Sequence, residues 1–173
     1  MRRVVLGACS IIRIQSWDSE GRAPATVNDI FGVAWPQKTG TVASGRVDII
    51  CVGPTDWLVL AADPDAASWL HQFDTLFQGS TFRATNVSQA LVRFQTEGPE
   101  VRDLLAKGCS IDLHPPHFPP GRSARTRFAG MPVIVHCTGP STFECIVTLS
   151  YADYLRSWLA DAALEFEAAT QCD

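Results

Sequence analysis

The chain has 173 residues and a formal net charge of −4, with 46% hydrophobic and 18% charged residues. These values are ordinary for a soluble globular protein of one domain, or of two small subdomains that share a core. The acidic balance argues against general nucleic-acid binding and against a basic membrane-surface patch. No apolar run approaches the length that spans a bilayer.

The amino terminus resembles a lipoprotein signal, because Arg2-Arg3 precedes the run from Val4 to Cys9. A working signal needs an apolar core of about 7–15 residues. Only Val4 to Leu6 are strongly apolar here, and polar residues follow at once. We therefore expect no signal sequence and a cytoplasmic protein.

The cysteines show no C-x-x-C pair and none of the spacings typical of zinc sites or disulfide frameworks. Cys51, Cys137 and Cys145 lie in apolar, strand-like runs, where a free thiol behaves as a small hydrophobic group. We therefore expect reduced, buried thiols rather than disulfide bridges. The six cysteines are Cys9, Cys51, Cys109, Cys137, Cys145 and Cys172.

The first half of the chain predicts the order strand, helix, strand, strand, helix, strand. The strands are expected at 9–14, 47–52, 57–61 and 81–87, and the helices at 27–31 and 65–77. Asp63 is the expected N-cap of the second helix, with Pro64 at its first position. This element order is that of a ferredoxin-like unit.

The second half predicts another unit, with a proline-rich loop in its middle. Its first helix is expected to begin at Pro99 and to end before Gly108. Strands are expected at 90–94, 124–129, 132–137 and 142–149, the first helix at 99–107, and the loop at 114–121.

The last helix has the clearest pattern in the sequence. Ser150 is a candidate N-cap, and Asp153 three residues later would complete a capping box. The apolar residues recur at helical spacing and predict one buried stripe. They are Tyr151, Leu155, Trp158, Leu159, Ala162 and Phe166.

Together these elements predict an α+β fold of mainly antiparallel sheets with helices packed on them. We expect one unit over residues 1–173, with subdomains at approximately 9–88 and 89–168, the first of them ferredoxin-like. No linker is long enough to separate independent domains.

The sequence contains no recognisable catalytic or nucleotide-binding signature. Gly40 and Gly45 have P-loop spacing, but the segment lacks the lysine and the hydroxyl residue that bind phosphate and magnesium. No G-x-G-x-x-G follows a strand, and no G-x-S-x-G is present. We therefore assign no catalytic and no cofactor-binding residue.

Cys109, Asp112, His114 and His117 form the one metal-like cluster in the sequence. A thiolate and two histidines could begin a zinc site. The two prolines between the histidines, however, hold the backbone extended, and Asp112 is an unusual fourth ligand. We assign no metal ligand, and expect Asp112 to satisfy backbone donors after the helix while the histidines line a partner-facing loop.

Arg122, Arg125 and Arg127 form the densest basic patch, and the last two share one face of a strand. Two interpretations stay open: a solvated face, or an anchor for a carboxylate-rich partner.

Trp17, Trp35 and Trp57 lie beside turn-forming or charged residues. They are either hot spots for association or core side chains.

The segment from Lys107 to Phe166 carries a family resemblance. Its positions, in order, are Lys107, Gly108, Cys109, Ile111, Asp112, Leu113, His114, Pro115, Phe118, Gly121, Thr126, Ala129, Phe143, Val147, Ser150, Ala152, Leu155, Trp158, Leu159, Ala163, Glu165 and Phe166. This ordered set resembles the gamma subunit family of heterotetrameric sarcosine oxidase. The similarity extends more weakly to residues 53–58.

The resemblance implies an accessory subunit of a flavin-dependent complex that oxidatively demethylates sarcosine to glycine, with tetrahydrofolate able to accept the one-carbon unit. It implies alpha, beta and delta subunits as partners. FAD, FMN, NAD and tetrahydrofolate would lie in alpha and beta and zinc in delta, so we expect no cofactor in this chain and no catalysis by it alone. The implied fold is similar to the folate-binding part of the glycine-cleavage T protein, an aminomethyltransferase, but a shared fold is not evidence of folate binding.

Two other functions stay open. One is a stand-alone tetrahydrofolate or one-carbon binding module, in which Asp56 or Asp112 would read the pterin ring. The other is a structural adaptor of another N-methyl amino acid oxidase.

Overall fold

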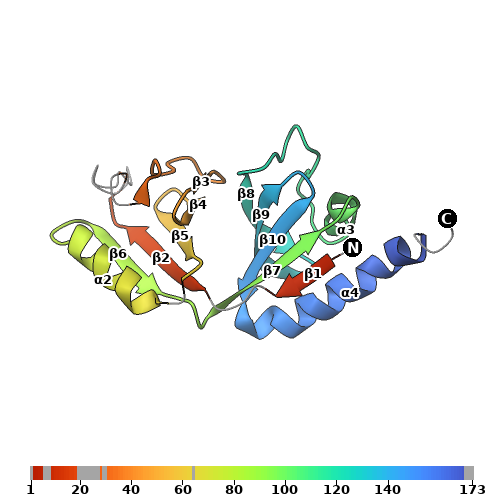
Figure 1. Cartoon of the computed structure of the whole chain (residues 1–173). Helices are drawn as coiled ribbons and strands as arrows, with labels where there is room; N and C mark the ends of the chain where they lie inside the picture. Colours follow the sequence, from red (N-terminus) through yellow and green to blue (C-terminus); the bar gives the residue numbers. More distant parts are fainter. Residues whose placement is uncertain (1, 6–8, 19–27, 29–30, 64, 170–173) are drawn as a thin grey trace. The chain divides into compact units, whose positions relative to one another are not determined.

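The computed structural model describes all residues except 1, 6–8, 19–27, 29–30, 64 and 170–173. The chain forms two compact units (Figure 1). The N-terminal unit is Gly7–Ala90, and the C-terminal unit combines Met1–Leu6 with Leu91–Asp173. No helix in the described part of the chain is long and apolar enough to cross a membrane.

The N-terminal unit is built on a five-stranded antiparallel sheet in the order β3-β4-β5-β2-β6. Its strands are β2 (Ser10–Ser16), β3 (Val42–Ser44), β4 (Asp48–Gly53), β5 (Asp56–Ala61) and β6 (Phe82–Asn86). Without the short edge strand β3, the order β4-β5-β2-β6 is that of a ferredoxin-like sheet, as predicted. The sequence did not predict β3, which lies in the glycine-containing segment that superficially resembles a P-loop.

Helix α2 (Ala66–Leu76) begins at a different cap from the one predicted. The Asp65 carboxylate accepts a hydrogen bond from the Ser68 N–H at 3.0 Å, so Asp65 is the N-cap. Asp63 instead accepts from the Asp65 N–H at 2.9 Å, one step outside the helix. Pro64 lies outside the described residues.

The helix expected at 27–31 falls mostly outside the described residues. Asn28 and Phe31 are helical, and the Gly32 N–H donates to the Asn28 carbonyl at 2.9 Å. Gly32 has a φ of 67°, the left-handed conformation that glycine adopts most easily when it ends a helix. The expected end of this helix is therefore observed.

The core of the N-terminal unit is dominated by aromatic rings. Trp57 is completely buried, and its indole N–H donates to the Pro36 carbonyl at 2.7 Å. Rings in successive contact extend across the core: Trp69, Phe31, Phe73, Phe77, Phe82, Trp57 and Trp35. Trp35 and Trp57 are therefore core residues, whereas Trp17 is 73% exposed.

The C-terminal unit has a second antiparallel sheet, in the order β1-β7-β10-β9-β8. Its strands are β1 (Arg2–Val5), β7 (Leu91–Glu97), β8 (Ser123–Phe128), β9 (Met131–Gly139) and β10 (Thr142–Thr148). The last four match the predicted strands to within a few residues. The sequence did not predict β1, which pairs with β7 and brings the start of the chain into this unit.

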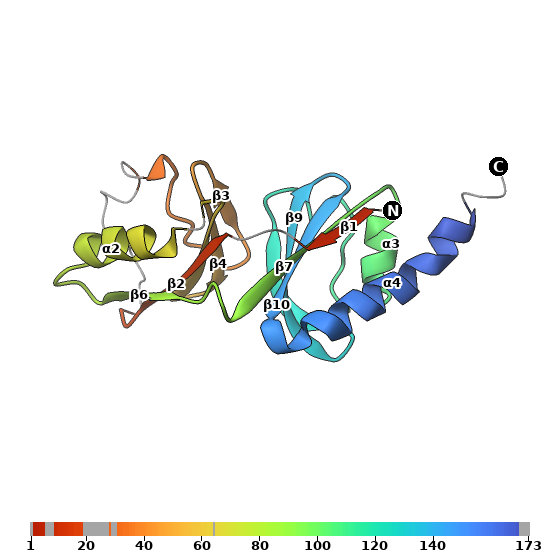
Figure 2. The same ribbon diagram turned by 60° about the horizontal axis from the view of Figure 1, so that its bottom comes forward.

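Helices α3 (Val101–Ala106) and α4 (Ala152–Ala169) share one core with this sheet, and Figure 2 shows them near each other. The predicted cap of α4 is wrong, because Ser150 lies inside a 3₁₀ turn, Leu149–Tyr151, that precedes the helix. The buried stripe is also rotated. Leu155, Leu159 and Ala163 are its fully buried centre, whereas Tyr151 is exposed.

Gly108 follows α3 for a packing reason that differs from the predicted one. Its φ is not positive, so it does not end the helix in the left-handed conformation. A Cβ at this position would lie 2.9 Å from both Phe128 Cζ and Trp158 Cη2. The absence of a side chain therefore lets β8 and α4 approach the end of α3.

Candidate functional site

The predicted metal-like cluster is divided between the core and the surface. Cys109 is buried and forms an isolated β-bridge with Phe128, whereas Asp112, His114 and His117 are exposed. In the part of the chain that the structure describes, no three His, Cys, Asp or Glu side chains are arranged to hold a metal ion. The cluster is better described by its hydrogen bonds.

Asp112 organises the turn that contains the two histidines. Its carboxylate accepts from the His114 N–H at 2.9 Å and pairs with His117 Nδ1. The bond from His117, and then the one from the His114 backbone, lower the pKa of Asp112 below its usual range. The prediction that Asp112 satisfies a backbone donor after the helix is confirmed.

Arg102, on α3, fixes the rest of this loop. Its Nη1 donates to the carbonyl of Leu113 and, at 3.1 Å, to that of Phe118. Its Nη2 donates to the Pro140 carbonyl at 3.2 Å, in the turn between β9 and β10. One guanidinium thus ties together three carbonyls that no strand or helix would satisfy, which suits the fixed fork of donors on arginine.

Apolar packing holds the same guanidinium in place. It lies 4.8 Å from the ring centre of Phe143, which is a favourable cation–π position. Its Nη2 also lies 3.7 Å from Cys137 Sγ. Burial raises the pKa of the Cys137 thiol despite the opposing effect of Arg102. Cys137 is therefore a packing residue and not an activated nucleophile.

We define the clasped loop as Asp112–Gly121. Leu113 and Phe118 are its buried anchors, each 4% exposed. The remaining side chains face outward and are those of Asp112, His114, Pro115, Pro116, His117, Pro119 and Pro120. The loop thus presents prolines and imidazoles from a backbone that Arg102 holds from below.

Arg125 and Arg127 lie on β8, an edge strand of the sheet, whereas Arg122 lies between the loop and this strand. Arg125 and Arg127 are both exposed and alternate with less exposed residues, so they share one face of the strand, as their two-residue spacing predicted. Arg127 Nη2 donates to the Gly130 carbonyl at 2.8 Å, and Arg125 also takes part in an interaction. From Leu113 to Phe143 the chain contains no acidic residue.

Lys107 joins the end of α3 to α4. Its Nζ donates to the Ala162 carbonyl at 2.7 Å, lies 2.6 Å from Glu165 Oε1, and sits 4.5 Å from the ring centre of Phe166. Three residues that carry the family resemblance therefore have structural roles. Lys107 and Gly108 position α4 against the end of α3, and Asp112 positions the clasped loop.

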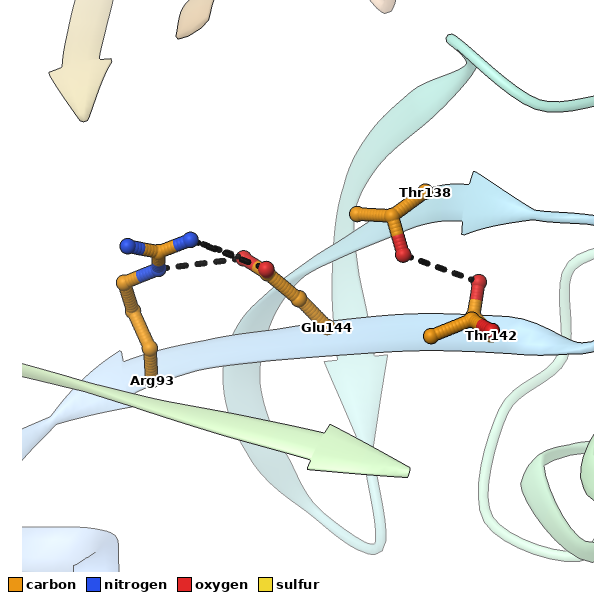
Figure 3. A network of polar contacts seen from close by, with 4 residues as sticks. All are labelled: Arg93, Thr138, Thr142 and Glu144. Carbon is orange, nitrogen blue, oxygen red and sulfur yellow. Dashed lines mark hydrogen bonds and ion pairs between the residues drawn. The ribbon is translucent and has the colours of Figure 1, made fainter. Parts of the chain in front are cut away.

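A nearly buried ion pair of the C-terminal unit lies on its sheet (Figure 3). Arg93 on β7 makes three hydrogen bonds of 2.8–3.0 Å to the Glu144 carboxylate on β10. The two side chains are only 12% and 7% exposed. Thr138 Oγ1 donates to the Thr142 carbonyl at 3.2 Å across the neighbouring turn.

The N-terminal unit has a similar but more exposed pair. Arg13 donates to both carboxylate oxygens of Asp56, at 2.8 and 2.7 Å. Hydrogen bonding to Asp56 raises the pKa of Arg13. Asp56 was one of the two candidate carboxylates for hydrogen bonding to a pterin ring. In the structure it pairs with Arg13 and so links β5 to β2.

Sequence reasoning missed Arg102, which has no motif around it and carbonyl partners that are 11 to 38 residues away. It did select the loop, through its prolines and its resemblance to the family.

The chain matches the family described as "Sarcosine oxidase, gamma subunit family" over residues 18–165. A sarcosine oxidase subunit gamma from Corynebacterium sp. (strain U-96) is 32% identical over 145 residues, which are 80% of this chain and 67% of the relative. A sarcosine oxidase subunit gamma from Arthrobacter sp. is 26% identical over 142 residues, 81% of this chain and 69% of the relative.

Two solved structures share the fold. The heterotetrameric sarcosine oxidase from Corynebacterium sp. U-96, in complex with pyrrole 2-carboxylate, contains a chain with a TM-score of 0.85 and 23% identity, covering 95% of this chain and 84% of that one. The glycine cleavage system aminomethyltransferase T from Bartonella henselae has a TM-score of 0.65 and 10% identity, covering 91% and 44%. The predicted aminomethyltransferase-like α+β fold is confirmed.

Proposed function

Because the chain belongs to the sarcosine oxidase gamma subunit family, we propose that it is the accessory gamma subunit of a heterotetrameric sarcosine oxidase. The observation that carries this proposal is the family match over residues 18–165, which includes parts of both units. The relatives that carry the name subunit gamma support it, since the alignment with each covers at least 80% of this chain.

In this proposal the chain works in the cytoplasm with alpha, beta and delta subunits, in a complex that oxidatively demethylates sarcosine to glycine. The partners hold FAD, FMN, NAD, tetrahydrofolate and zinc. The role of this chain is architectural: it covers surface on the larger subunits and so helps to keep their sites in position.

Three of the buried thiols are poorly suited to nucleophilic catalysis. Burial raises the pKa of Cys51, Cys137 and Cys145, that of Cys145 to about 12. A thiol with a raised pKa carries little thiolate at neutral pH and is a poor nucleophile.

The contacts of two carboxylates favour this function over a stand-alone folate-binding module. Asp56 is occupied by Arg13, and Asp112 by His117 and the His114 backbone. A pterin ring would have to displace these partners before either carboxylate could read it. The likeness to aminomethyltransferase T shows the fold alone, and carries no folate site with it.

Co-expression of the tagged chain with the other three subunits tests the proposal. We expect all four subunits to elute together in size exclusion. The isolated chain should show no flavin absorbance and release no peroxide with sarcosine. Failure to co-elute, or peroxide from the isolated chain, would overturn the proposal. Calorimetry of the isolated chain with tetrahydrofolate tests the folate-binding alternative directly.

A further inference from the structure

We propose that a surface of the C-terminal unit docks an apolar segment of a larger partner subunit, and that this segment presents a carboxylate to Arg127. The surface lies where the turn between β8 and β9 meets the start of α4. It consists of Arg127, Leu149, Tyr151 and Tyr154, and we call it the tyrosine patch. This inference rests on the proposed function, because it names the surface through which the gamma subunit would join its complex.

The first reason is that exposed apolar side chains concentrate at this place. In the described part of the chain five large hydrophobic side chains are exposed, and three of them lie within six residues. They are Leu149 at 56%, Tyr151 at 39% and Tyr154 at 50%. Tyr151 and Tyr154 are three positions apart, a spacing that brings side chains together on one face of a helix. A contiguous exposed apolar patch marks a protein contact, and tyrosine is enriched in the residues that contribute most to binding.

The second reason is that two side chains of the patch are already held in position. The Tyr154 hydroxyl donates to the Ala129 carbonyl at 3.0 Å, and Arg127 Nη2 donates to the Gly130 carbonyl at 2.8 Å. These are consecutive carbonyls of one turn, so the phenol and the guanidinium lie beside the same two residues. Side chains that are fixed before binding lose little conformational entropy on docking.

The turn that holds these side chains has a strained backbone. Ala129 and Gly130 have φ angles of 47° and 88°, the combination of a type I′ hairpin turn. Among the described residues Ala129 is the only one other than glycine with a positive φ, a conformation that alanine adopts with strain. Its N–H donates to the Gly108 carbonyl at 2.8 Å. Strain that the surroundings maintain in this way is common at functional surfaces.

The third reason is charge, and it specifies the partner. Arg127 is exposed, and its hydrogen bond goes to the neutral Gly130 carbonyl, which does not offset the positive charge. Asp153, in the first turn of α4, pairs with Arg156, so these two charges offset each other. A partner carboxylate would form a charge-assisted hydrogen bond with Arg127 at the edge of the apolar contact. Self-pairing of the patch around a two-fold axis would instead bring two copies of Arg127 together, and like charges repel.

A competition experiment tests the apolar part of the patch in the assembled complex. Wild-type and variant chains with different tags are co-expressed with limiting amounts of the other three subunits. The ratio of tags in the complex is then compared with that in the unassembled pool. The test variant is Leu149→Gln. Its matched control is Leu164→Gln, since Leu164 is a leucine of α4 with nearly the same exposure, 59% against 56%.

We expect Leu149→Gln to be disfavoured about tenfold or more, as for a residue that contributes strongly to binding. Leu164→Gln should compete within about twofold of the wild type, as exposed substitutions outside a contact usually do. Melting curves of the isolated variants control for folding and should match that of the wild type. If Leu149→Gln does not fold, Tyr151→Gln takes its place in the same comparison, with the same expected loss.

The same competition tests the carboxylate partner of Arg127. Arg127→Glu places like charges across the contact and should be disfavoured about tenfold or more. Arg127→Gln removes the charge only and should show a smaller loss, which shrinks as salt screens the interaction. The control is Arg83→Glu, because Arg83 is an exposed arginine on β6, an edge strand of the other unit. It should compete within about twofold of the wild type.

The possible outcomes separate the inference from the proposed function. If the wild-type chain does not enter the complex, the proposed function fails. If it enters and Leu149→Gln competes equally with it, or no worse than Leu164→Gln, the tyrosine patch is overturned. If Leu149→Gln is disfavoured but Arg127→Glu competes equally, the acidic character of the partner is wrong. A concentration-dependent dimer of the isolated chain that Leu149→Gln abolishes would show that a second copy occupies the patch, and would also overturn the proposal.

Discussion

The two units fill their hydrophobic cores with different kinds of side chain. The N-terminal unit fills its core with three tryptophans and four phenylalanines, around a ferredoxin-like sheet and α2. The core of the C-terminal unit is mainly aliphatic and includes three cysteines. Its cations Arg93, Arg102 and Lys107 join segments that lie far apart in the sequence.

The difference shows which parts of the chain need polar side chains to fix their conformation. Regular elements with large rings need few polar connections, because backbone groups pair within the sheet and the rings fill the volume. The C-terminal unit contains the clasped loop, whose carbonyls need partners from elsewhere. Arg102 supplies these partners for Leu113, Phe118 and Pro140.

The largest effect we predict is that of Trp57→Ala in the N-terminal unit. Trp57 is completely buried between Trp35 and Phe82, so its truncation should cost about 3–5 kcal/mol. Chemical denaturation followed by far-UV circular dichroism measures the loss. Trp17→Ala makes the same change at a 73% exposed position and should stay within about 0.5 kcal/mol of the wild type. Equal losses would show that the ring cluster does not dominate this unit.

The next effect compares the ion pairs of the two units. Glu144→Gln removes the charge that Arg93 faces in a nearly buried site, and should cost about 3 kcal/mol. Asp56→Asn makes the equivalent change next to Arg13, which is 39% exposed, and should cost about 1 kcal/mol or less. The same denaturation assay measures both. A larger loss for Asp56→Asn would contradict the expectation that the less exposed pair, Arg93–Glu144, contributes more to stability.

Much of this comparison could be predicted from the sequence, because it follows from local patterns. Apart from β1 and β3, the order of the described elements was predicted correctly, and the helix predicted at 65–77 is observed as α2, which buries Trp69 and Phe73. Strand β1 was missed because its partner β7 lies some ninety residues away. Local patterns carry no information on such distant pairings. Strand β3 pairs with the adjacent β4 and was missed because its three residues are too few to show an alternating pattern.

The wrong details concern positions where more than one residue fits the sequence pattern equally well. Only the three-dimensional path of the backbone decides between such residues. Asp63 and Asp65 are both good N-caps by type, and only the backbone path decides between them. The clasped loop was selected correctly as a segment. Its organiser Arg102 was not, because an arginine in a helical pattern is usually a solvated side chain.

A smaller effect is expected from Gly108→Ala, which tests how closely the C-terminal unit is packed. The added methyl group would meet the buried Phe128 ring and the Trp158 ring at 2.9 Å, and should cost about 1–3 kcal/mol. The cost should fall in a Trp158→Leu background, because one of the two rings is then gone. A double-mutant cycle of unfolding free energies measures this coupling. A cycle with no coupling would show that the close approach to Trp158 does not constrain this position.

The smallest effect concerns Asp112→Asn on the clasped loop. The folded-state pKa of Asp112 is lowered, so its carboxylate stabilises the folded chain at pH values above its unfolded pKa. That contribution is lost as the pH falls through the lowered value. Because Asp112 and His117 are both exposed, water and salt screen the interaction, and the melting midpoints of variant and wild type should differ little at neutral pH.

A carboxyl titration of Asp112 by NMR measures the lowered pKa, and His117→Gln should bring it back toward the usual value. The restoration should be partial, because the His114 N–H still donates to the carboxylate. A large loss of stability in Asp112→Asn at neutral pH would be the contrary result. It would mean that the outer half of the loop, and not Arg102 with its anchors Leu113 and Phe118, carries the energy that keeps this segment in place.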